Sequence, residues 1–453
     1  MAPIGLSVRP FAALIYSALG IWLCGAWAVD ALGAEGAAFP AEEWETTTPE
    51  QAGLDGAKLR QAREYALTGE GSGMIVRGGK VVLSWGDTRR RCDLKSTTKS
   101  FGATAVGIAI ADGKVRLDDK AADVHPSLGV PPEENRDTGW LKEITLLHLA
   151  TQTAGFEKPG GYGRLLFRPG TKWHYSDAGP NWLAECVTLR YRRDLRDVMF
   201  DRVFTPLGIT ADDLTWRSNQ YRPHAIDGIP NREFGAGIHA NVDAMARVGY
   251  LYLRRGRWGE SQILPPDFVD AARQPPAWLV ALPEHEPKSE HGDASKHYGL
   301  LWWNNADGAL PPPVPRDAYW SWGLYDSLIV VIPSLDLVVA RAGKSWERKK
   351  GAAHYDVLEP FLVPICGAVK DPPQDRPQAQ GVRVRRIEWD PPHTIVRRAK
   401  GSDTRGTSTR ATARVSRQSG SPPTEEARTS SSRATTASAS ARRLLCSARS
   451  ESR

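Results

Sequence analysis

The stretch "STTKSFGATAVGIAIADG", from Ser96 to Gly113, decides how the chain is built. After its first turn the residues are apolar or small almost all round, a pattern typical of a helix buried in the middle of a protein. Asp112 and Gly113 give the helix an end, because glycine readily adopts the left-handed conformation that stops a helix. The sequence therefore predicts one buried helix from Ser96 to about Ala111.

Ser96 and Lys99 stand at the start of this predicted helix and would lie on the same face. A serine hydroxyl needs a neighbouring base to act as a nucleophile, and a lysine serves only in its neutral form, which burial favours. N–H groups of the first turn suit a developing oxyanion. The alternative interpretation is a serine N-cap beside a solvated lysine. No other S-x-x-K occurs in the chain, and a solvated lysine is hard to place in an apolar helix.

Strand patterns lie on both sides of a mainly helical region. The stretch "GMIVRGGKVVLSWG", residues 73–86, predicts a β-hairpin around a Gly-Gly-Lys turn. The stretches "AYWSWGLYDSLIVVIP" and "LDLVVARAG" return to strand patterns, whereas residues 118–285 mix helices with loops rich in proline and glycine. The sheet would come from the two ends of the domain. This predicts a mostly antiparallel α+β architecture with an inserted helical lobe, not a βαβ repeat.

Composition sets the two ends of the chain apart. Residues 1–34 hold an uncharged run and the A-x-A spacing of Ala26 and Ala28, which is typical of an export signal. A retained membrane anchor is the alternative, because the run is about long enough to span a bilayer. Residues 371–453 are rich in Arg, Ser, Thr, Ala and Pro and are predicted to be disordered; a shifted reading frame is the alternative. We expect an exported, extracytoplasmic protein with its domain at residues 40–370.

The charge pattern excludes a basic binding face for nucleic acid. Residues 371–453 hold 17 lysines and arginines against 8 acidic residues, a net +9, which leaves −2 for residues 1–370 out of the +7 of the whole chain. The five cysteines include no C-x-x-C pair, and the histidines of "HEPKSEH" are six apart around a proline. We therefore expect a small-molecule partner, with no metal and no nucleic acid.

A second motif, Tyr175-Ser176-Asp177, lies in "FRPGTKWHYSDAGPNWLAE" just before a predicted helix. A tyrosine near a buried lysine can exchange protons with it, so Tyr175 could act as general base or return the proton to the leaving group. The alternative is a tyrosine packed in the core with its hydroxyl satisfied.

Together the motifs resemble the serine β-lactamase-related family, meaning class C β-lactamases, penicillin-binding carboxypeptidases and related esterases. The resemblance covers roughly residues 44–368 and implies a two-lobed β-lactamase/transpeptidase-like fold. It implies that Ser96 forms an acyl-enzyme, that Lys99 and Tyr175 manage its proton, and that no metal or cofactor takes part. It rests on the two motifs above and on four further stretches, "VRLDDKAADVHPSL", "ITLLHLATQTAGF", "GAGIHANVDAMARVGYLYLRRGRWGESQIL" and "LIVVIPSLDLVVAR".

Two departures from the family pattern shape the expected chemistry. Asp177 stands where the family usually has asparagine, and an ionised carboxylate cannot donate to a substrate carbonyl but could pair with Lys99. The third motif, Ser321-Trp322-Gly323, lacks the usual lysine or histidine that helps to hold a substrate carboxylate. By analogy, Gly323 lets substrate approach the strand, and the N–H of Leu324 joins that of Ser96 in an oxyanion hole.

These features predict a serine hydrolase that acts on carboxylic esters or small amides. The alternatives are a D-aminopeptidase, carboxypeptidase or weak β-lactamase, and an inactive protein that binds cell-wall fragments. The tryptophans near the third motif could line an acyl pocket or pack in the core. Because side chains alternate along a strand, one of Trp302 and Trp303 must turn away from any single face.

Overall fold

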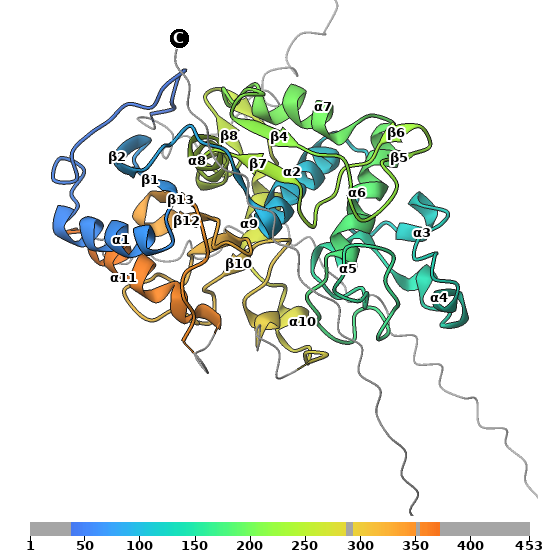
Figure 1. Ribbon diagram of the computed structural model, residues 1–453. Coiled ribbons are helices and arrows are strands. Elements are labelled where there is room, and N and C mark those ends of the chain that lie inside the picture. The colour runs from blue at the N-terminus through green and yellow to red at the C-terminus, as the bar shows by residue number, and fades with distance from the viewer. Residues whose placement is uncertain (1–37, 287–292, 350–353, 372–453) are drawn as a thin grey trace, which may run out of the picture. The chain divides into compact units, whose positions relative to one another are not determined.

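The computed structural model describes residues 38–286, 293–349 and 354–371 (Figure 1). The predicted export signal or anchor at residues 1–34 and the predicted tail after residue 371 lie outside these ranges. Among the helices within them, none combines the length and the apolar character needed to cross a membrane.

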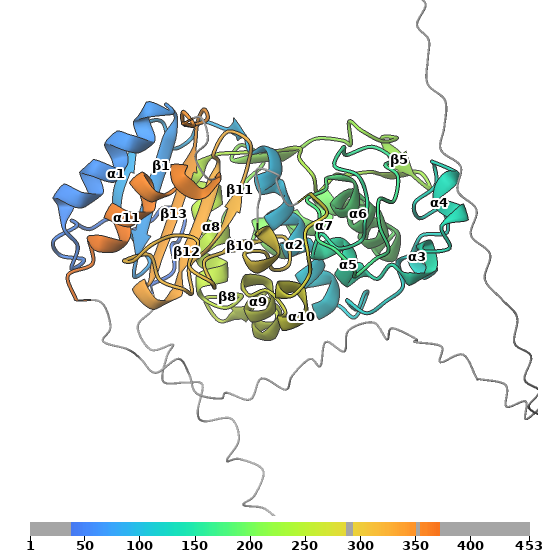
Figure 2. The same ribbon diagram turned by 90° about the horizontal axis from the view of Figure 1, so that it is seen from below.

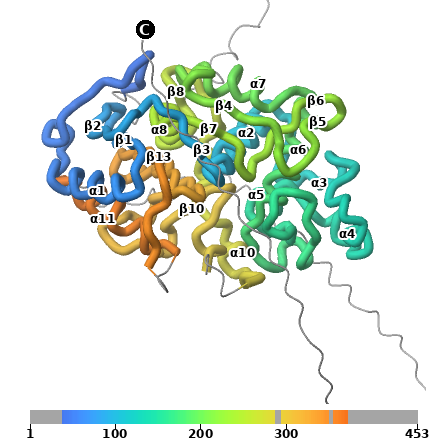
Figure 3. Tube along the Cα trace, viewed as in Figure 1, coloured from blue at the N-terminus to red at the C-terminus, as the bar shows by residue number. Residues whose placement is uncertain are grey.

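A six-stranded antiparallel sheet is made from both ends of the described chain. Its strand order is β10-β11-β12-β13-β1-β2, so the first strand lies between its hairpin partner and the last strand (Figure 3). Helices follow or precede these strands along the chain. The predicted antiparallel α+β class is therefore confirmed. The strands are β1 (Ser72–Arg77), β2 (Lys80–Trp85), β10 (Trp303–Asn304), β11 (Tyr319–Trp322), β12 (Leu328–Ile332) and β13 (Leu337–Ala342).

The β1–β2 pair is the predicted hairpin. Gly78 and Gly79 both have positive φ angles, 60° and 81°, which suit the tight turn that matches the twist of paired strands. Along β1, Met74 packs into one apolar cluster and Ile75 into another, so the two faces of the sheet face two different cores.

Helices cover both faces of the sheet (Figure 2). One face packs against α1 (Gly56–Thr68) and α11 (Glu359–Gly367), which also contact each other. The other face packs against α8 (Val242–Leu253), where Gly249 allows close approach to the strands. Asn241 caps α8 by accepting a hydrogen bond from the Ala244 N–H at 2.8 Å. This helix falls inside the region predicted as the helical lobe, yet it belongs to the packing of the sheet.

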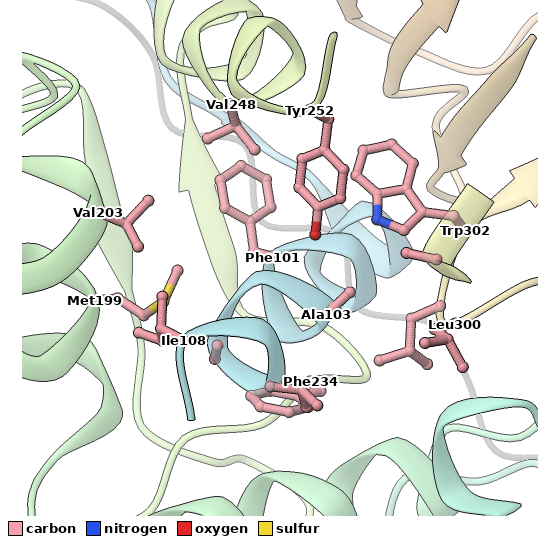
Figure 4. Close-up of a cluster of buried hydrophobic side chains, with 14 of the residues drawn as sticks. Phe101, Ala103, Ile108, Met199, Val203, Phe234, Val248, Tyr252, Leu300 and Trp302 are labelled. Atoms are coloured by element: carbon pink, nitrogen blue, oxygen red, sulfur yellow. The ribbon is translucent and has the colours of Figure 1, made fainter. Parts of the chain in front are cut away.

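The central helix α2 (Thr98–Ala111) is buried almost throughout and packs against α8. Figure 4 shows its Phe101 among side chains of α8, with Phe234 on another side of the helix. Its end at Asp112 and Gly113 agrees with the sequence expectation. Its start differs, because Lys95 has a φ of +49° and residues Lys95–Thr97 form a 3₁₀ turn before the α-helix begins.

The remaining elements build the helical lobe and its connections. Pairing of β3 with β7, supported by the Leu94 N–H on the Ile238 carbonyl at 3.0 Å, brings residues 235–240 beside the start of α2. The elements are α3 (Ala121–Val124), α4 (Glu134–Asp137), α5 (Leu146–Ala150), α6 (Ala178–Tyr191), α7 (Leu195–Met199), α9 (Pro266–Arg273) and α10 (Ala277–Val280), with the short strands β3 (Cys92–Asp93), β4 (Leu214–Trp216), β5 (Ala225–Ile226), β6 (Ile229–Pro230), β7 (Ile238–Ala240), β8 (Arg257–Trp258) and β9 (Ser261–Gln262).

Candidate active site

Ser96 and Lys99 meet at the start of α2, as the S-x-x-K spacing predicts. The Lys99 ammonium donates a hydrogen bond to Ser96 Oγ at 3.0 Å. Lys99 is only 2% exposed, whereas Ser96 is partly exposed at the surface of the same turn. A buried amine is therefore held against a hydroxyl that solvent or a substrate can reach.

Lys99 has three acceptors, which match the three N–H bonds of a lysine ammonium. Besides Ser96 Oγ, these are the carbonyl oxygen of Gly235 at 3.0 Å and the carboxylate of Asp177, with which Lys99 forms an ion pair. The pairing of Asp177 with Lys99 agrees with the possibility raised by the sequence. In this arrangement Lys99 is a hydrogen-bond donor, so it can accept a proton only after losing one.

The segment that carries Tyr175 and Asp177 is clamped by Gln152. The Gln152 amide donates to the Ser176 carbonyl and accepts from the Ser176 N–H, both at 3.0 Å, while its own carbonyl accepts from the His174 N–H at 3.0 Å. Gln152 has a φ of +65°, a backbone conformation that is uncommon outside glycine and asparagine. A side chain in the loop after α5 thus fixes the tyrosine motif at the start of α6.

The Tyr175 ring lies against two lysines. Its centroid is 4.9 Å from Lys99 Nζ and 4.9 Å from Lys158 Nζ. The ring stacks on Trp303 at 5.7 Å with an interplanar angle of 29°. Trp302 instead packs against Tyr252 in the opposite cluster, 4.6 Å away, so strand alternation does separate the two tryptophans (Figure 4).

The loop before β7 supplies the third side of the site. Asn181 Oδ1 accepts the Gly235 N–H at 2.8 Å and so holds the carbonyl that Lys99 contacts. Glu233, two residues earlier, is buried and forms an ion pair with Arg217. Burial raises the pKa of Glu233 to about 7, opposed by the Arg217 guanidinium and reinforced by the Asp177 carboxylate.

The third motif joins the sheet to the nucleophile turn. Ser321 is 1% exposed; its hydroxyl contacts Thr97 Oγ1 at 3.3 Å and accepts the Ile329 N–H at 2.8 Å. A Cβ on Gly323 would overlap the Leu94 carbonyl, so this glycine permits close approach of the protein's own backbone. Trp322 donates from Nε1 to Asp326 at 2.9 Å and lies in the core of the sheet lobe. The Ser321 and Trp322 side chains, expected at the substrate, are thus engaged inside the protein.

The turn after Gly323 carries the expected oxyanion donor. Leu324 is 66% exposed, and its N–H has no hydrogen-bond partner among the residues that the structure describes. Buried Arg341 holds the turn by donating to the Tyr325 and Asp326 carbonyls at 2.6 and 3.0 Å. An N–H on a fixed, open turn can bind a substrate oxygen.

Sequence reasoning missed Gln152, Lys158, Gly235 and Glu233. Gln152 and Gly235 lie in stretches that carry the family resemblance, but a clamping amide and an accepting carbonyl leave no mark in residue type or spacing. Lys158 lies seventeen residues before Tyr175 in a glycine-rich loop, with no periodicity to point to it. Within the described ranges, no three His, Cys, Asp or Glu side chains are grouped so that they could hold a metal ion.

Comparison with known families gives one match over most of the described chain. The family described as Beta-lactamase matches residues 66–358, which include every residue of the site above. The match confirms the resemblance carried by the sequence motifs. No curated protein sequence matches the chain.

Solved structures similar to this chain share its fold at low sequence identity. A putative β-lactamase from Bacteroides dorei is 16% identical with a TM-score of 0.55, covering 70% of this chain and 99% of its own. Simvastatin synthase from Aspergillus terreus is 17% identical with a TM-score of 0.53, covering 70% and 98%. A putative 6-aminohexanoate-dimer hydrolase from Bacillus anthracis is 15% identical with a TM-score of 0.52, covering 67% and 80%. The predicted two-lobed fold is therefore confirmed.

Proposed function

The chain belongs to the β-lactamase family, and on that premise we propose that it is a serine hydrolase that forms an acyl-enzyme on Ser96. The observation that carries the proposal is the 3.0 Å hydrogen bond between Ser96 Oγ, which is accessible, and the buried Lys99 ammonium. A cation at this distance favours the serine alkoxide over the alcohol. Attack on an ester carbonyl forms the Ser96 Oγ–acyl bond, and the alcohol leaves with a proton before water releases the acid.

Proton transfer in this proposal involves Tyr175 as well as Lys99. Because Lys99 already donates to three acceptors, its charge stabilises the developing alkoxide while another group takes the serine proton. Tyr175 is the candidate, since its ring lies 4.9 Å from Lys99 Nζ. The same tyrosine would then protonate the leaving group. The N–H groups of Ser96 and Leu324 are the proposed oxyanion donors.

Carboxylic esters and small amides are the proposed substrate class. The third motif offers no cation, and the Ser321 hydroxyl is engaged with Thr97 and Ile329. Efficient capture of a β-lactam or D-amino-acid peptide by that motif is therefore disfavoured. The competing function is binding of cell-wall fragments without turnover, which the Lys99–Asp177 ion pair favours because it keeps the lysine charged.

The test compares hydrolysis of p-nitrophenyl butyrate by the purified protein and by Ser96→Ala, with intact mass measured during turnover. Exposed Ser127 provides the control variant Ser127→Ala. We expect wild type and S127A to hydrolyse the ester and carry an acyl adduct, and S96A to do neither. Equal rates in wild type and S96A, with no adduct in either, would contradict the proposal and favour the binding function.

A further inference from the structure

Lys158 belongs to a loop that is bonded directly to the tyrosine motif. Its backbone carbonyl accepts the Asp177 N–H at 2.8 Å. The carbonyl of the preceding residue, Glu157, accepts a hydrogen bond from Ser176 Oγ at 2.6 Å. Two successive residues of the loop are thus fixed to two successive residues of the site, so the start of the Lys158 side chain has a defined position.

The Lys158 side chain is exposed and extends over the site. Its Nζ is 4.9 Å from the Tyr175 ring centroid, as is Lys99 Nζ. The two nitrogens therefore cannot be further apart than twice that distance, and Lys99 Nζ is 3.0 Å from Ser96 Oγ. A small ester bound at Ser96 can reach Lys158.

The charge of Lys158 is not neutralised by a neighbouring carboxylate. Asp177 pairs with Lys99, and Glu157 pairs with Arg164 at 2.9 Å. Lys95, on the nucleophile turn itself, pairs with Asp93 at 2.6 Å. Among the residues that the structure describes, Lys158 forms no ion pair and only its contact with the Tyr175 ring. The rim of the site therefore presents one free ammonium.

We propose that Lys158 binds a carboxylate of the substrate and selects esters or small amides that carry this group beyond the scissile bond. The inference rests on the proposed function, and it assigns to a loop lysine the anion binding that Ser321 cannot provide. A lysine ammonium and a carboxylate form a charge-assisted hydrogen bond without demanding planar geometry. Solvent exposure limits the strength of the pair.

The test uses two matched pairs of substrates, because the carboxylate could lie on either side of the scissile bond. For the leaving-group side, 3-butyryloxybenzoate is compared with 3-butyryloxybenzamide. For the acyl side, the mono-4-nitrophenyl ester of adipic acid is compared with its methyl ester. We expect wild-type kcat/KM to favour the anionic member of at least one pair about three- to tenfold, mainly through KM.

Lys158→Met removes the ammonium and keeps the length and most of the apolar stem. We expect it to collapse the preference toward equality and Lys158→Arg to retain most of it. Lys142→Met is the matched control, because Lys142 is also exposed and unpaired among the described residues but lies in another loop of the lobe. The preference should also weaken as salt is raised. Equal rates on both members of both pairs, or a preference that K158M and K142M change alike, would overturn the proposal.

Binding to Ser96→Ala separates this inference from the proposed function. Ligand-observed NMR titration with the same pairs measures recognition without turnover. Tighter binding of an anionic member by S96A, lost in S96A/K158M, supports the role of Lys158 even if wild type hydrolyses nothing. Equal binding of all anionic and neutral members by S96A overturns it, even if wild type is an active hydrolase.

Discussion

The first turn of α2 and the turns that follow it are equally buried, yet they are held in different ways. In the first turn, Ser100 Oγ donates to the Leu301 carbonyl at 2.8 Å and Thr98 Oγ1 accepts the Ile238 N–H at 3.2 Å. Lys99 adds its three polar contacts. From Phe101 onward the helix instead packs through apolar side chains, with Phe101 and Ile108 fully buried (Figure 4).

This difference separates positioning from stability within a single helix. The polar groups of the first turn reach segments far apart in sequence, and each hydrogen bond contributes only about 1 kcal/mol net. The apolar turns bury large side chains, which contribute about 1.5 to 3 kcal/mol each. Changes in the first turn should therefore mainly affect activity, whereas changes further along α2 should mainly affect folding.

The largest expected effect is on catalysis by Lys99→Met. Because the ammonium that contacts Ser96 disappears, we expect kcat/KM for p-nitrophenyl butyrate to fall about a thousandfold. The loss also leaves the Asp177 carboxylate without its partner. Adding Asp177→Asn removes that charge, so urea denaturation should show K99M/D177N to be more stable than K99M while remaining inactive. Recovery of activity in the double variant would contradict the separation.

Phe101→Ala tests the apolar part of α2. Truncating this fully buried ring should lower the free energy of unfolding by about 3 to 5 kcal/mol, because a cavity forms beside α8. Urea titration measures the loss. Activity per folded molecule, obtained by active-site titration at low temperature, should stay within a few-fold of wild type. A loss of activity per folded molecule as large as that of K99M would break the comparison.

His148 tests a buried polar group outside α2, in the cap of α5. Its Nδ1 accepts the Thr145 N–H at 3.2 Å, and burial lowers the pKa of His148 to about 4, with the Lys120 charge acting in the same direction. The unfolded chain binds the proton first, from about pH 6.5 downward. Up to about 3 kcal/mol of stability should therefore be present above pH 6.5 and be lost as the pH falls to 4.

Urea midpoints of wild type and His148→Gln between pH 7 and 4 measure this dependence. The variant should lack the His148 contribution, so the difference in stability between the two proteins should shrink toward pH 4. A constant difference would show that His148 is not held neutral. Hydrolysis at neutral pH should change little, because His148 has no contact with Ser96 or Lys99.

Two glycines of α2 give the smallest and most selective effect. A Cβ on Gly102 would lie 2.5 Å from the Phe234 ring, and one on Gly107 would lie 2.7 Å from the Phe268 ring. Each alanine variant should lose about 1 to 3 kcal/mol of stability by overpacking. Only Gly102→Ala should also lower kcat, because displacing Phe234 moves the adjacent Gly235 carbonyl away from Lys99. Equal kcat in G102A and G107A would contradict this coupling.

The sequence by itself determined the features that depend on neighbours along the chain. The apolar run after Ser96, the glycine turn of the β1–β2 hairpin and the cap of α8 each reflect local geometry and propensity. For the same reason the proximity of Ser96 and Lys99 followed from their spacing on one helical turn. The order of motifs then led to the family.

Only the tertiary structure decided which groups surround that pair. The Gly235 carbonyl and the Asp177 carboxylate meet Lys99 from segments 136 and 78 residues away, and pairing of β3 with β7 is what brings the first of them into place. The third motif shows the same limit. Ser321 fits a substrate-binding position by analogy, but the approach of β11 to the nucleophile turn commits its hydroxyl to Thr97. Residue type and spacing encode chemistry and local conformation, whereas contacts between distant segments arise only when the whole core packs.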